Sequence, residues 1–333
     1  MIRVPFAELK ATLVRIFVGK GMDAPRAELC ATMFAETTRD GVYTHGVERI
    51  PRLLKMIDSG VVNVHAVPEL KSGFGAVEAW DGKGGLGNLN ARACMARAIE
   101  LARLHGMGCV ALANTNHWMR AGSYGWQAAE AGMIGICWTN TLPNVPAWGS
   151  AIPSIGNNPL VIAVPRPKGH VVLDMAATQF SYGALGAYRS RGELLPVPGG
   201  FDMEGNLTRD PAAIEQSQRL LPIGYWKGSG LAVMMDMIGA MLSGGLATHM
   251  MSKDPLLETG LSQVFITFNL AAIQPVEQYT HTADAVIASL LQPGEPEGTV
   301  RYPGEKVLKS RAENGAKGVP VREALWEELQ QHA

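Results

Sequence analysis

The chain has no excess of charge of either sign. Lysine and arginine together number 29, aspartate and glutamate number 30, and the formal net charge at pH 7 is −1. No block of like charges stands out anywhere along the sequence. Proteins that bind nucleic acids or anionic membrane surfaces usually carry clustered positive charge. We therefore expect neither a nucleic acid nor a membrane as a partner of this protein.

Cysteine and metal-ligand patterns are also scarce. The cysteines Cys30, Cys94, Cys109 and Cys137 form no C-x-x-C pair, and most lie among apolar residues. This pattern predicts buried, unreactive thiols. No H-x-x-x-H or H-E-x-x-H spacing occurs, so we expect no metal site. Because residues 1–20 also lack a signal-peptide pattern, we expect a cytoplasmic protein.

Long hydrophobic runs are missing as well. The most apolar segment, Ser229 to Ser243, is shorter than the roughly 20 residues that span a bilayer, and Asp236 lies near its middle. The segment is apolar on nearly all sides, which predicts a helix buried in the protein core. A carboxylate in such a helix needs hydrogen-bonding partners, and we expect a structural role for Asp236.

The order of the predicted elements suggests a mixed fold. The chain has 333 residues, enough for about two domains. We expect strands at 75–80, 108–113, 133–140, 160–165, 171–175 and 263–270, helices at 88–105, 123–131, 282–291, 305–314 and 321–331, and mostly loop at 186–221. This order predicts an α/β (α+β) fold with a mixed sheet. The helical segment 1–72 is expected to pack with the C-terminal helices of 301–333, beside a central α/β region at 73–300.

A glycine-rich run imitates a dinucleotide-binding motif. Residues 82–87 read G-K-G-G-L-G, and they follow a predicted strand and precede a predicted helix. The Rossmann fingerprint also needs an acidic residue at the end of the next strand, to bind the ribose hydroxyls. That strand leads into Asn114-Thr115-Asn116-His117, where no acid stands. A glycine turn capped by Asn88 explains the run as well, and we predict a non-Rossmann domain.

The most informative segment is 40–52, which reads D-G-V-Y-T-H-G-V-E-R-I-P-R. If it is helical, His45, Arg49 and Arg52 follow i, i+4, i+7 spacing and share one face. A histidine exchanges a proton near neutral pH, and an arginine matches a carboxylate in shape and charge. Reduction of a 2-oxo acid needs this combination. A solvated arginine face with a capping histidine fits the same spacing.

Four further segments extend the pattern over nearly the whole chain. They are 116–125 (N-H-W-M-R-A-G-S-Y-G), 135–140 (G-I-C-W-T-N), 200–208 (G-F-D-M-E-G-N-L-T) and 221–230 (L-P-I-G-Y-W-K-G-S-G). Together with His45, these segments resemble the malate/L-lactate dehydrogenase family, which does not use a Rossmann domain. The resemblance implies an NAD(P)H-dependent oxidoreductase that reduces a 2-oxo acid and forms a homodimer. The tryptophan-containing motifs favour a sugar-derived acid such as 2,3-diketo-L-gulonate.

The resemblance also implies roles for single residues. His45 takes the place of the proton donor, and Arg49 stands where the substrate carboxylate binds. Arg52, His117 and Arg120 are further candidates for substrate binding.

The family's cofactor-binding stretches fall on three segments of this chain. They are His170, Val171, Val172, Leu173, Asp174, Met175 and Ala176, then Trp226 and Lys227, and then Gly304, Glu305 and Lys306. His170 departs from the family's pattern, and so does Glu305, where close relatives usually have histidine. An acid at position 305 favours the ribose hydroxyls of NADH over the phosphate of NADPH.

Other functions are compatible with the same residues. A 2-hydroxyacid dehydrogenase acting on L-malate or L-lactate needs the same carboxylate site. A cofactor-free sugar-acid lyase or isomerase, with His45 and His117 as acid and base, needs it too. A non-catalytic binding protein is the third alternative.

Overall fold

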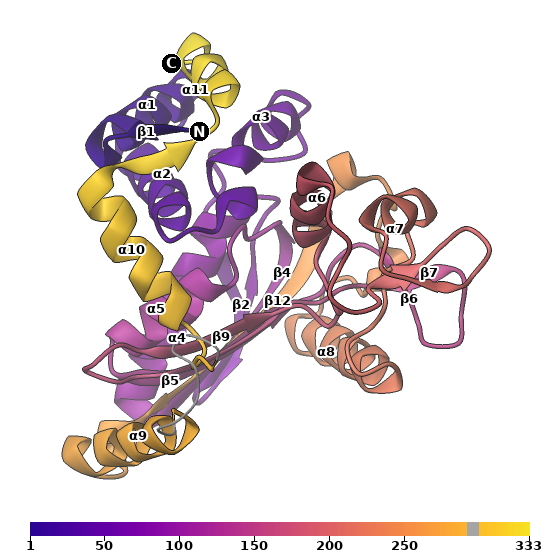
Figure 1. The fold of residues 1–333 in the computed structure, drawn as a ribbon. Coiled ribbons are helices and arrows are strands. Elements are labelled where there is room, and N and C mark those ends of the chain that lie inside the picture. The colour runs from indigo at the N-terminus through magenta and orange to yellow at the C-terminus, as the bar shows by residue number, and fades with distance from the viewer. Residues whose placement is uncertain (292–299) are drawn as a thin grey trace.

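The structure, a computed structural model, describes residues 1–291 and 300–333; residues 292–299, at the end of the predicted central region, lie outside it. Its centre is a seven-stranded sheet with the strand order β2-β3-β4-β12-β5-β8-β9 (Figure 1). These strands are β2 Glu69–Phe74, β3 Val77–Asp81, β4 Met107–Asn116, β5 Met133–Thr139, β8 Leu160–Val164, β9 Val171–Met175 and β12 Thr259–Asn269. The predicted mixed α/β fold is confirmed.

Smaller strand pairs and the helices complete the described chain. The pairs join β1 Ile2–Val4 with β13 Val319–Val321, β6 Val145–Pro146 with β7 Pro153–Ile155, and β10 Gly200–Phe201 with β11 Leu207–Thr208. The helices are α1 Phe6–Gly19, α2 Ala24–Arg39, α3 Ile50–Asp58, α4 Gly87–His105, α5 Gly122–Glu130, α6 Tyr182–Arg191, α7 Pro211–Ser217, α8 Trp226–Ser243, α9 Val276–Leu290, α10 Glu305–Lys317 and α11 Glu323–Gln331.

The strand directions of the central sheet explain why the glycine run is not a Rossmann fingerprint. Among its described strands, β3 and β4 are parallel, and every other neighbouring pair is antiparallel. A doubly wound dinucleotide domain needs a series of parallel strands. The unit β3–α4–β4 is therefore an isolated βαβ element inside a mixed sheet.

Helices cover both faces of the sheet. Val110 and Leu112 of β4 belong to the large core that also contains residues of α4 and α5. Cys109 and Ala111 pack instead in a second core that includes Ala232 of α8. Because successive residues of a strand point to opposite faces, α8 lies on the face opposite α4 and α5 (Figure 1).

The two ends of the chain lie together (Figure 1). Strand β1 pairs with β13, and α1 and α2 contact α11 and α10. Helix α2 begins after Asp23, which caps it by accepting a hydrogen bond from the Arg26 N–H at 3.0 Å. It ends before Gly41, whose φ of +85° suits glycine.

The prediction of mostly loop at 186–221 missed two helices and a strand pair, although the rest of the region is irregular. Helices α6 and α7 and the short strands β10 and β11 occupy much of this region. Both helices have capped starts: Ser181 accepts from the Ala184 N–H, and Asp210 accepts from the Ala212 N–H. The pair Asp210-Pro211 is a helix-start signal that the abundance of glycine and proline obscured.

The prediction that the apolar helix near residue 236 is buried is also wrong. One side of α8 packs on the sheet through Ala232, Met235 and Gly239, but its other side is exposed. The expected structural role of Asp236 is supported, since its side chain accepts hydrogen bonds from Asn140 Nδ2 and from the Thr248 N–H. Among the described residues, no helix combines the length and apolar character that a membrane span requires.

Candidate active site

The segment 40–52 is not one continuous helix. The helical spacing that would place His45, Arg49 and Arg52 on one face therefore does not apply. Two short 3-10 turns, η1 Tyr43–His45 and η2 Val47–Arg49, precede α3. Gly46 separates the two turns, and a Cβ atom at this position would collide with Thr38 Oγ1. That hydroxyl instead accepts a hydrogen bond from the Val47 N–H at 3.0 Å. The close packing on α2 therefore fixes the path of the segment, and with it the position of His45.

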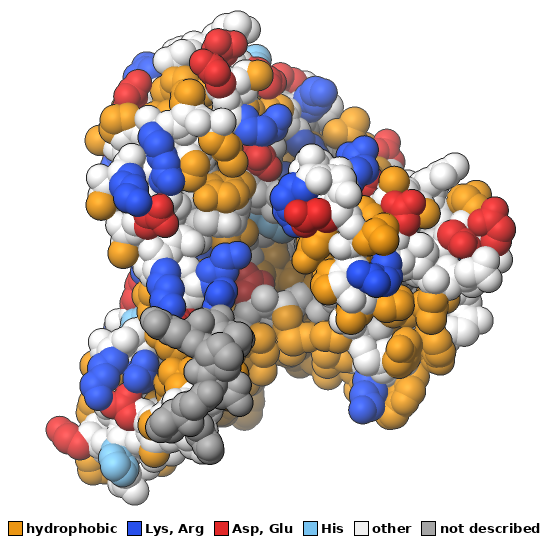
Figure 2. Space-filling view, in the orientation of Figure 1, with side chains coloured by type: hydrophobic (Ala, Val, Ile, Leu, Met, Phe, Trp, Pro, Cys, Tyr) orange, Lys and Arg blue, Asp and Glu red, His pale blue; other side chains and the backbone are white. Residues whose placement is uncertain are grey.

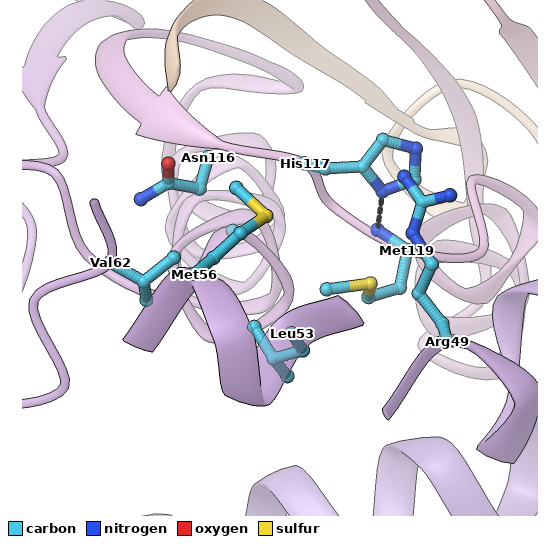
Figure 3. Close-up of a pocket in the computed structure, with 8 residues that line it drawn as sticks. Arg49, Leu53, Met56, Val62, Asn116, His117 and Met119 are labelled. Carbon is cyan, nitrogen blue, oxygen red and sulfur yellow. Dashed lines mark hydrogen bonds between the residues drawn. The ribbon is translucent and has the colours of Figure 1, made fainter. Parts of the chain in front are cut away.

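Two histidines face one another in this region. The rings of His45 and His117 stack with centroids 5.7 Å apart and an interplanar angle of 11°. His117 follows the end of β4, so the central sheet holds one ring and the η1 turn holds the other. Nδ1 of His117 accepts a hydrogen bond from the Met119 N–H at 3.0 Å (Figure 3). In the neutral ring, Nε2 therefore carries the proton and is a donor.

The charge around the two histidines disfavours their protonation. Burial, together with the positive charges of Arg49 and Arg120, lowers the pKa of His45 to about 4. Burial and the charges of Arg49, His45 and Arg52 place the pKa of His117 well below its ordinary value. Both rings are thus neutral at pH 7 in the absence of a ligand. An anion bound near Arg49 would offset part of this positive potential and favour protonation.

A small cavity adjoins His117 and Arg49. Its lining is mostly apolar on the α3 side and polar on the β4 side, and consists of Arg49, Leu53, Met56, Val62, Gly87, Asn116, His117 and Met119. Figure 3 shows the side chains of Arg49 and His117 close to one another at one end of this cavity. A pocket with an apolar wall, an arginine and a histidine suits a small organic acid.

Arg49 and Arg52 converge on a carboxylate that sequence reasoning missed. Nη2 of Arg49 lies 3.2 Å from Glu258 Oε2, and Nη2 of Arg52 lies 3.0 Å from the same oxygen. Glu258 is only 6% exposed. The sheet register explains its position, because Thr259 of β12 pairs with Asn116 of β4. No local signal marked Glu258, since its partners lie some two hundred residues earlier in the chain.

Arg120 occupies a different environment from the other candidates. It is 5% exposed, and its Nη1 lies 2.7 Å from Oδ2 of the buried Asp40. Arg311 binds both oxygens of Asp40, and Arg39 binds Oδ1. Arg120 also lines a second small cavity together with His45. Asp40 opens the 40–52 segment, so the position was in view, but its buried ion-pair role depends on residues far away in the sequence.

The three predicted cofactor stretches lie near one another. Val172, on the edge strand β9, donates its N–H to the Pro303 carbonyl at 3.0 Å. A Cβ atom on Gly304 would lie 3.1 Å from the Val172 nitrogen, so the first and third stretches are in close contact. Just before the second stretch, the Ile223 N–H donates to the Ala177 carbonyl, directly after the first.

Single residues of these stretches differ in their surroundings. Trp226 is 67% exposed at the start of α8, and Lys227 follows it. Glu305, at the start of α10, pairs through Oε1 with Lys309, whereas its buried Oε2 has no hydrogen-bond partner among the described residues. Asp174 accepts a hydrogen bond from the Gly122 N–H at 2.8 Å. His170 Nδ1 accepts one from the Arg166 N–H.

The glycine run 82–87 is packed against protein atoms. Asn116 Nδ2 donates to the carbonyls of Gly84 and Gly85, and the Gly84 N–H donates to the Asn114 carbonyl. A Cβ atom on Gly87 would collide with the carbonyl oxygens of Asn116 and His117. We had expected Asn88 to cap the glycine turn, but its side chain does not cap α4. Its Nδ2 donates to Cys30 Sγ instead. The glycine run therefore lets the start of α4 lie close to Asn116 and His117.

Comparisons with known proteins agree with this architecture. The chain is 43% identical over 338 aligned residues, 98% of this chain and 99% of the relative, to 2,3-diketo-L-gulonate reductase from Escherichia coli strain SE11. Among solved structures it resembles sulfolactate dehydrogenase from Methanocaldococcus jannaschii, with a TM-score of 0.91, 25% identity, and coverage of 99% of this chain and 96% of the other. It also resembles malate dehydrogenase from Pyrococcus horikoshii OT3, with a TM-score of 0.89, 27% identity, and coverage of 100% and 94%.

A family model carries the same conclusion. The model of the malate/L-lactate dehydrogenases matches residues 4–330, almost the full chain. The resemblance inferred from the motifs is confirmed. The chain belongs to the malate/L-lactate dehydrogenase family of oxidoreductases, which typically use a nicotinamide cofactor.

Proposed function

We propose that this protein is an NAD(P)H-dependent reductase of a 2-oxo acid, with His45 as the proton donor. The observation that carries the proposal is the stacked His45–His117 pair, of which His117 lines a small cavity together with Arg49. The similarity to 2,3-diketo-L-gulonate reductase makes that sugar-derived acid, or a related one, the expected substrate. The 2-hydroxyacid dehydrogenases of the family remain the alternative.

The side chains have distinct roles in this proposal. Arg49 binds the substrate carboxylate and so fixes which carbon is reduced. His117 donates a hydrogen bond from its Nε2–H group to the substrate oxygen and keeps its proton. His45 transfers a proton to that oxygen as negative charge develops there, and such a positioned acid contributes about 10²–10⁴-fold in rate. Arg52 assists Arg49 in binding the carboxylate. Arg120 acts on His45 through its positive charge.

The residues of the three stretches fit a nicotinamide cofactor, which supplies the hydride when it is bound. Residues His170 to Ala176, Trp226, Lys227 and Gly304 to Lys306 would hold it. The fit rests on two observations: main-chain atoms of β9 come close to Gly304, and the buried Glu305 Oε2 has no hydrogen-bond partner in residues 1–291 and 300–333. A carboxylate there accepts hydrogen bonds from ribose hydroxyls and repels a phosphate, which supports NADH over NADPH.

A homodimer is part of the proposal, and the exposed face of α8 supports it. Met234, Met237, Ile238 and Met241 follow helical spacing and are 38–77% exposed. Figure 2 shows hydrophobic side chains gathered over this part of the surface. Apolar patches of this kind usually mark an interface. The variant Met237→Glu/Met241→Glu should sediment as a monomer, whereas the control Leu104→Glu, at a 72% exposed position of α4, should sediment like the parent protein.

Two further expectations belong to the same proposal. We propose that residues 1–72 and 301–333 form one helical domain beside the central region 73–300. Strand pair β1–β13 and the ion pairs of Asp40 with Arg311 support this division. The four buried free thiols support a cytoplasmic location, where cysteines remain reduced.

A substrate panel tests the proposal. Protein is mixed with NADH or NADPH and with 2,3-diketo-L-gulonate, pyruvate, oxaloacetate or a cyclic imino acid, and the absorbance of the reduced nicotinamide is followed. We expect a decrease with at least one 2-oxo acid, and a faster one with NADH. No decrease with any acid would contradict the proposal. A change in the acid without consumption of nicotinamide would instead support the cofactor-free lyase or isomerase.

A further inference from the structure

The further inference concerns Glu258, the internal carboxylate between Arg49 and Arg52. One oxygen, Oε2, contacts both guanidinium groups, at 3.2 and 3.0 Å. Arg52 is held additionally by the carbonyl of Pro255, in the same loop as Glu258. Burial raises the pKa of Glu258, and the two arginines oppose this effect. A carboxylate bonded to two guanidinium groups is ionised at neutral pH.

The charges around the substrate cavity leave one positive charge unmatched. Arg49 and Arg52 contribute two positive charges, and Glu258 contributes one negative charge. His45 and His117 are neutral at pH 7, because burial and nearby arginines lower the pKa of each. Arg120 belongs to a separate ion-pair cluster, in which it shares Asp40 with Arg311 and Arg39. One substrate carboxylate therefore makes the group of Arg49, Arg52 and Glu258 neutral in total.

We propose that Glu258 is a specificity-determining residue that restricts the substrate site to oxo acids with a single carboxylate. It acts as a positioning residue, because it holds Arg49 in place without touching the substrate. It also engages Arg52, the group that a second substrate carboxylate would otherwise bind. This inference rests on the proposed function and deepens it, since 2,3-diketo-L-gulonate carries one carboxylate and malate carries two.

The argument predicts the sign of each charge change. Adding a positive charge to the site favours a dianion more than a monoanion, and removing one has the opposite effect. Arg52 is 27% exposed, so solvent weakens the interaction. We expect a selectivity change of about tenfold per unit of charge, or ~1.4 kcal/mol.

Binding of two unreactive probes tests the proposal. Oxamate has one carboxylate and tartronate has two, and calorimetry with the NADH-saturated protein gives the Kd of each. Selectivity is the Kd of oxamate divided by the Kd of tartronate. Glu258→Gln should raise it about tenfold, and Arg52→Gln should lower it about tenfold. The double variant Glu258→Gln/Arg52→Gln restores the charge count and should return to the selectivity of the parent protein.

A matched control separates specificity from a general loss of a buried ion pair. Glu78 is also 6% exposed and pairs with Arg97 at 2.7 Å, on β3 and α4. Glu78→Gln should leave the selectivity unchanged. An unchanged selectivity in Glu258→Gln, or a raised one that persists in the double variant, would overturn the proposal. If Glu258→Gln does not fold, an unchanged selectivity in Arg52→Gln would overturn it.

The outcome also distinguishes this proposal from the proposed function. A parent protein that binds neither probe and consumes NADH with no 2-oxo acid contradicts the proposed function. A parent protein that is active, and whose variants bind both probes with unaltered selectivity, contradicts only the role of Glu258.

Discussion

Replacement of Asp40 by asparagine tests the buried contact of this carboxylate with Arg120 and Arg311. Asp40 is 3% exposed, and its oxygens lie 2.7 Å from Arg120 Nη1 and 2.7 Å from Arg311 Nη2. Asparagine keeps the size of the side chain but removes its charge. Arg120, itself 5% exposed, then loses the carboxylate that its Nη1 contacts, while its positive charge remains buried. Breaking a buried pair in this way costs about 3–5 kcal/mol of the free energy of unfolding.

The expected loss can be measured by thermal unfolding. For a chain of this size, ~3–5 kcal/mol corresponds to a fall in Tm of roughly 4–7 °C. The control is Asp58→Asn, because Asp58 pairs with Lys20 at 2.5 Å but its side chain is 57% exposed. An exposed pair contributes at most about 1 kcal/mol, so Tm should fall by no more than ~2 °C. Equal losses of Tm in the two variants would refute the reasoning.

The pH dependence of the loss gives a second test of Asp40. Burial alone would raise the pKa of Asp40, but hydrogen bonds and charges from Arg311 and Arg120 outweigh burial and hold this pKa below its ordinary 3.8. A carboxylate with a lowered pKa contributes stability above the pKa of the unfolded chain, and this contribution disappears as the pH falls through the folded-state pKa. The difference in Tm between parent and Asp40→Asn should therefore be constant near neutrality and should shrink below about pH 4.

Three further predictions concern catalysis and packing. His45→Gln should lower kcat by about 10²–10⁴-fold, while NADH binding, followed by fluorescence, stays unchanged. In the parent protein the pKa of His45 is about 4. Because the acid must be protonated, kcat/KM for reduction should fall about tenfold per pH unit above that value. Arg49→Lys should mainly raise KM, since a point charge replaces a planar fork, and an unchanged KM would place the carboxylate elsewhere. Gly87→Ala should lower Tm and activity together, because its Cβ would displace the carbonyl of His117, whereas Gly315→Ala, where a Cβ meets open space, should do neither.

Local sequence signals predicted many of the elements and part of the site. The helices Gly87–His105 and Gly122–Glu130 and the buried strand Met133–Thr139 lie where the sequence indicated. These features depend on neighbouring residues: a cap, an apolar run or a turn. The motif that contains His45 and Arg49 was likewise visible, because both residues lie within one short segment.

The sequence alone was misleading where exposure or long-range contact decides the outcome. The apolar segment with Asp236 has the composition of a buried helix, yet one face of α8 is exposed. No local pattern tells which face of such a helix the sheet covers. The region 186–221 looked irregular because glycine and proline are frequent there, although Asp210 and Ser181 cap two helices.

The amino-acid sequence by itself determined the family, the mixed α/β class and the residue types that can donate a proton and bind a carboxylate. Only the tertiary structure decided how these residues meet. Glu258 reaches Arg49 because the pairing of β12 with β4 places Thr259 opposite Asn116, and His117 stacks on His45 because Gly46 packs tightly on α2. Such contacts join residues far apart in the chain, so they depend on the packing of whole elements rather than on any local sequence pattern.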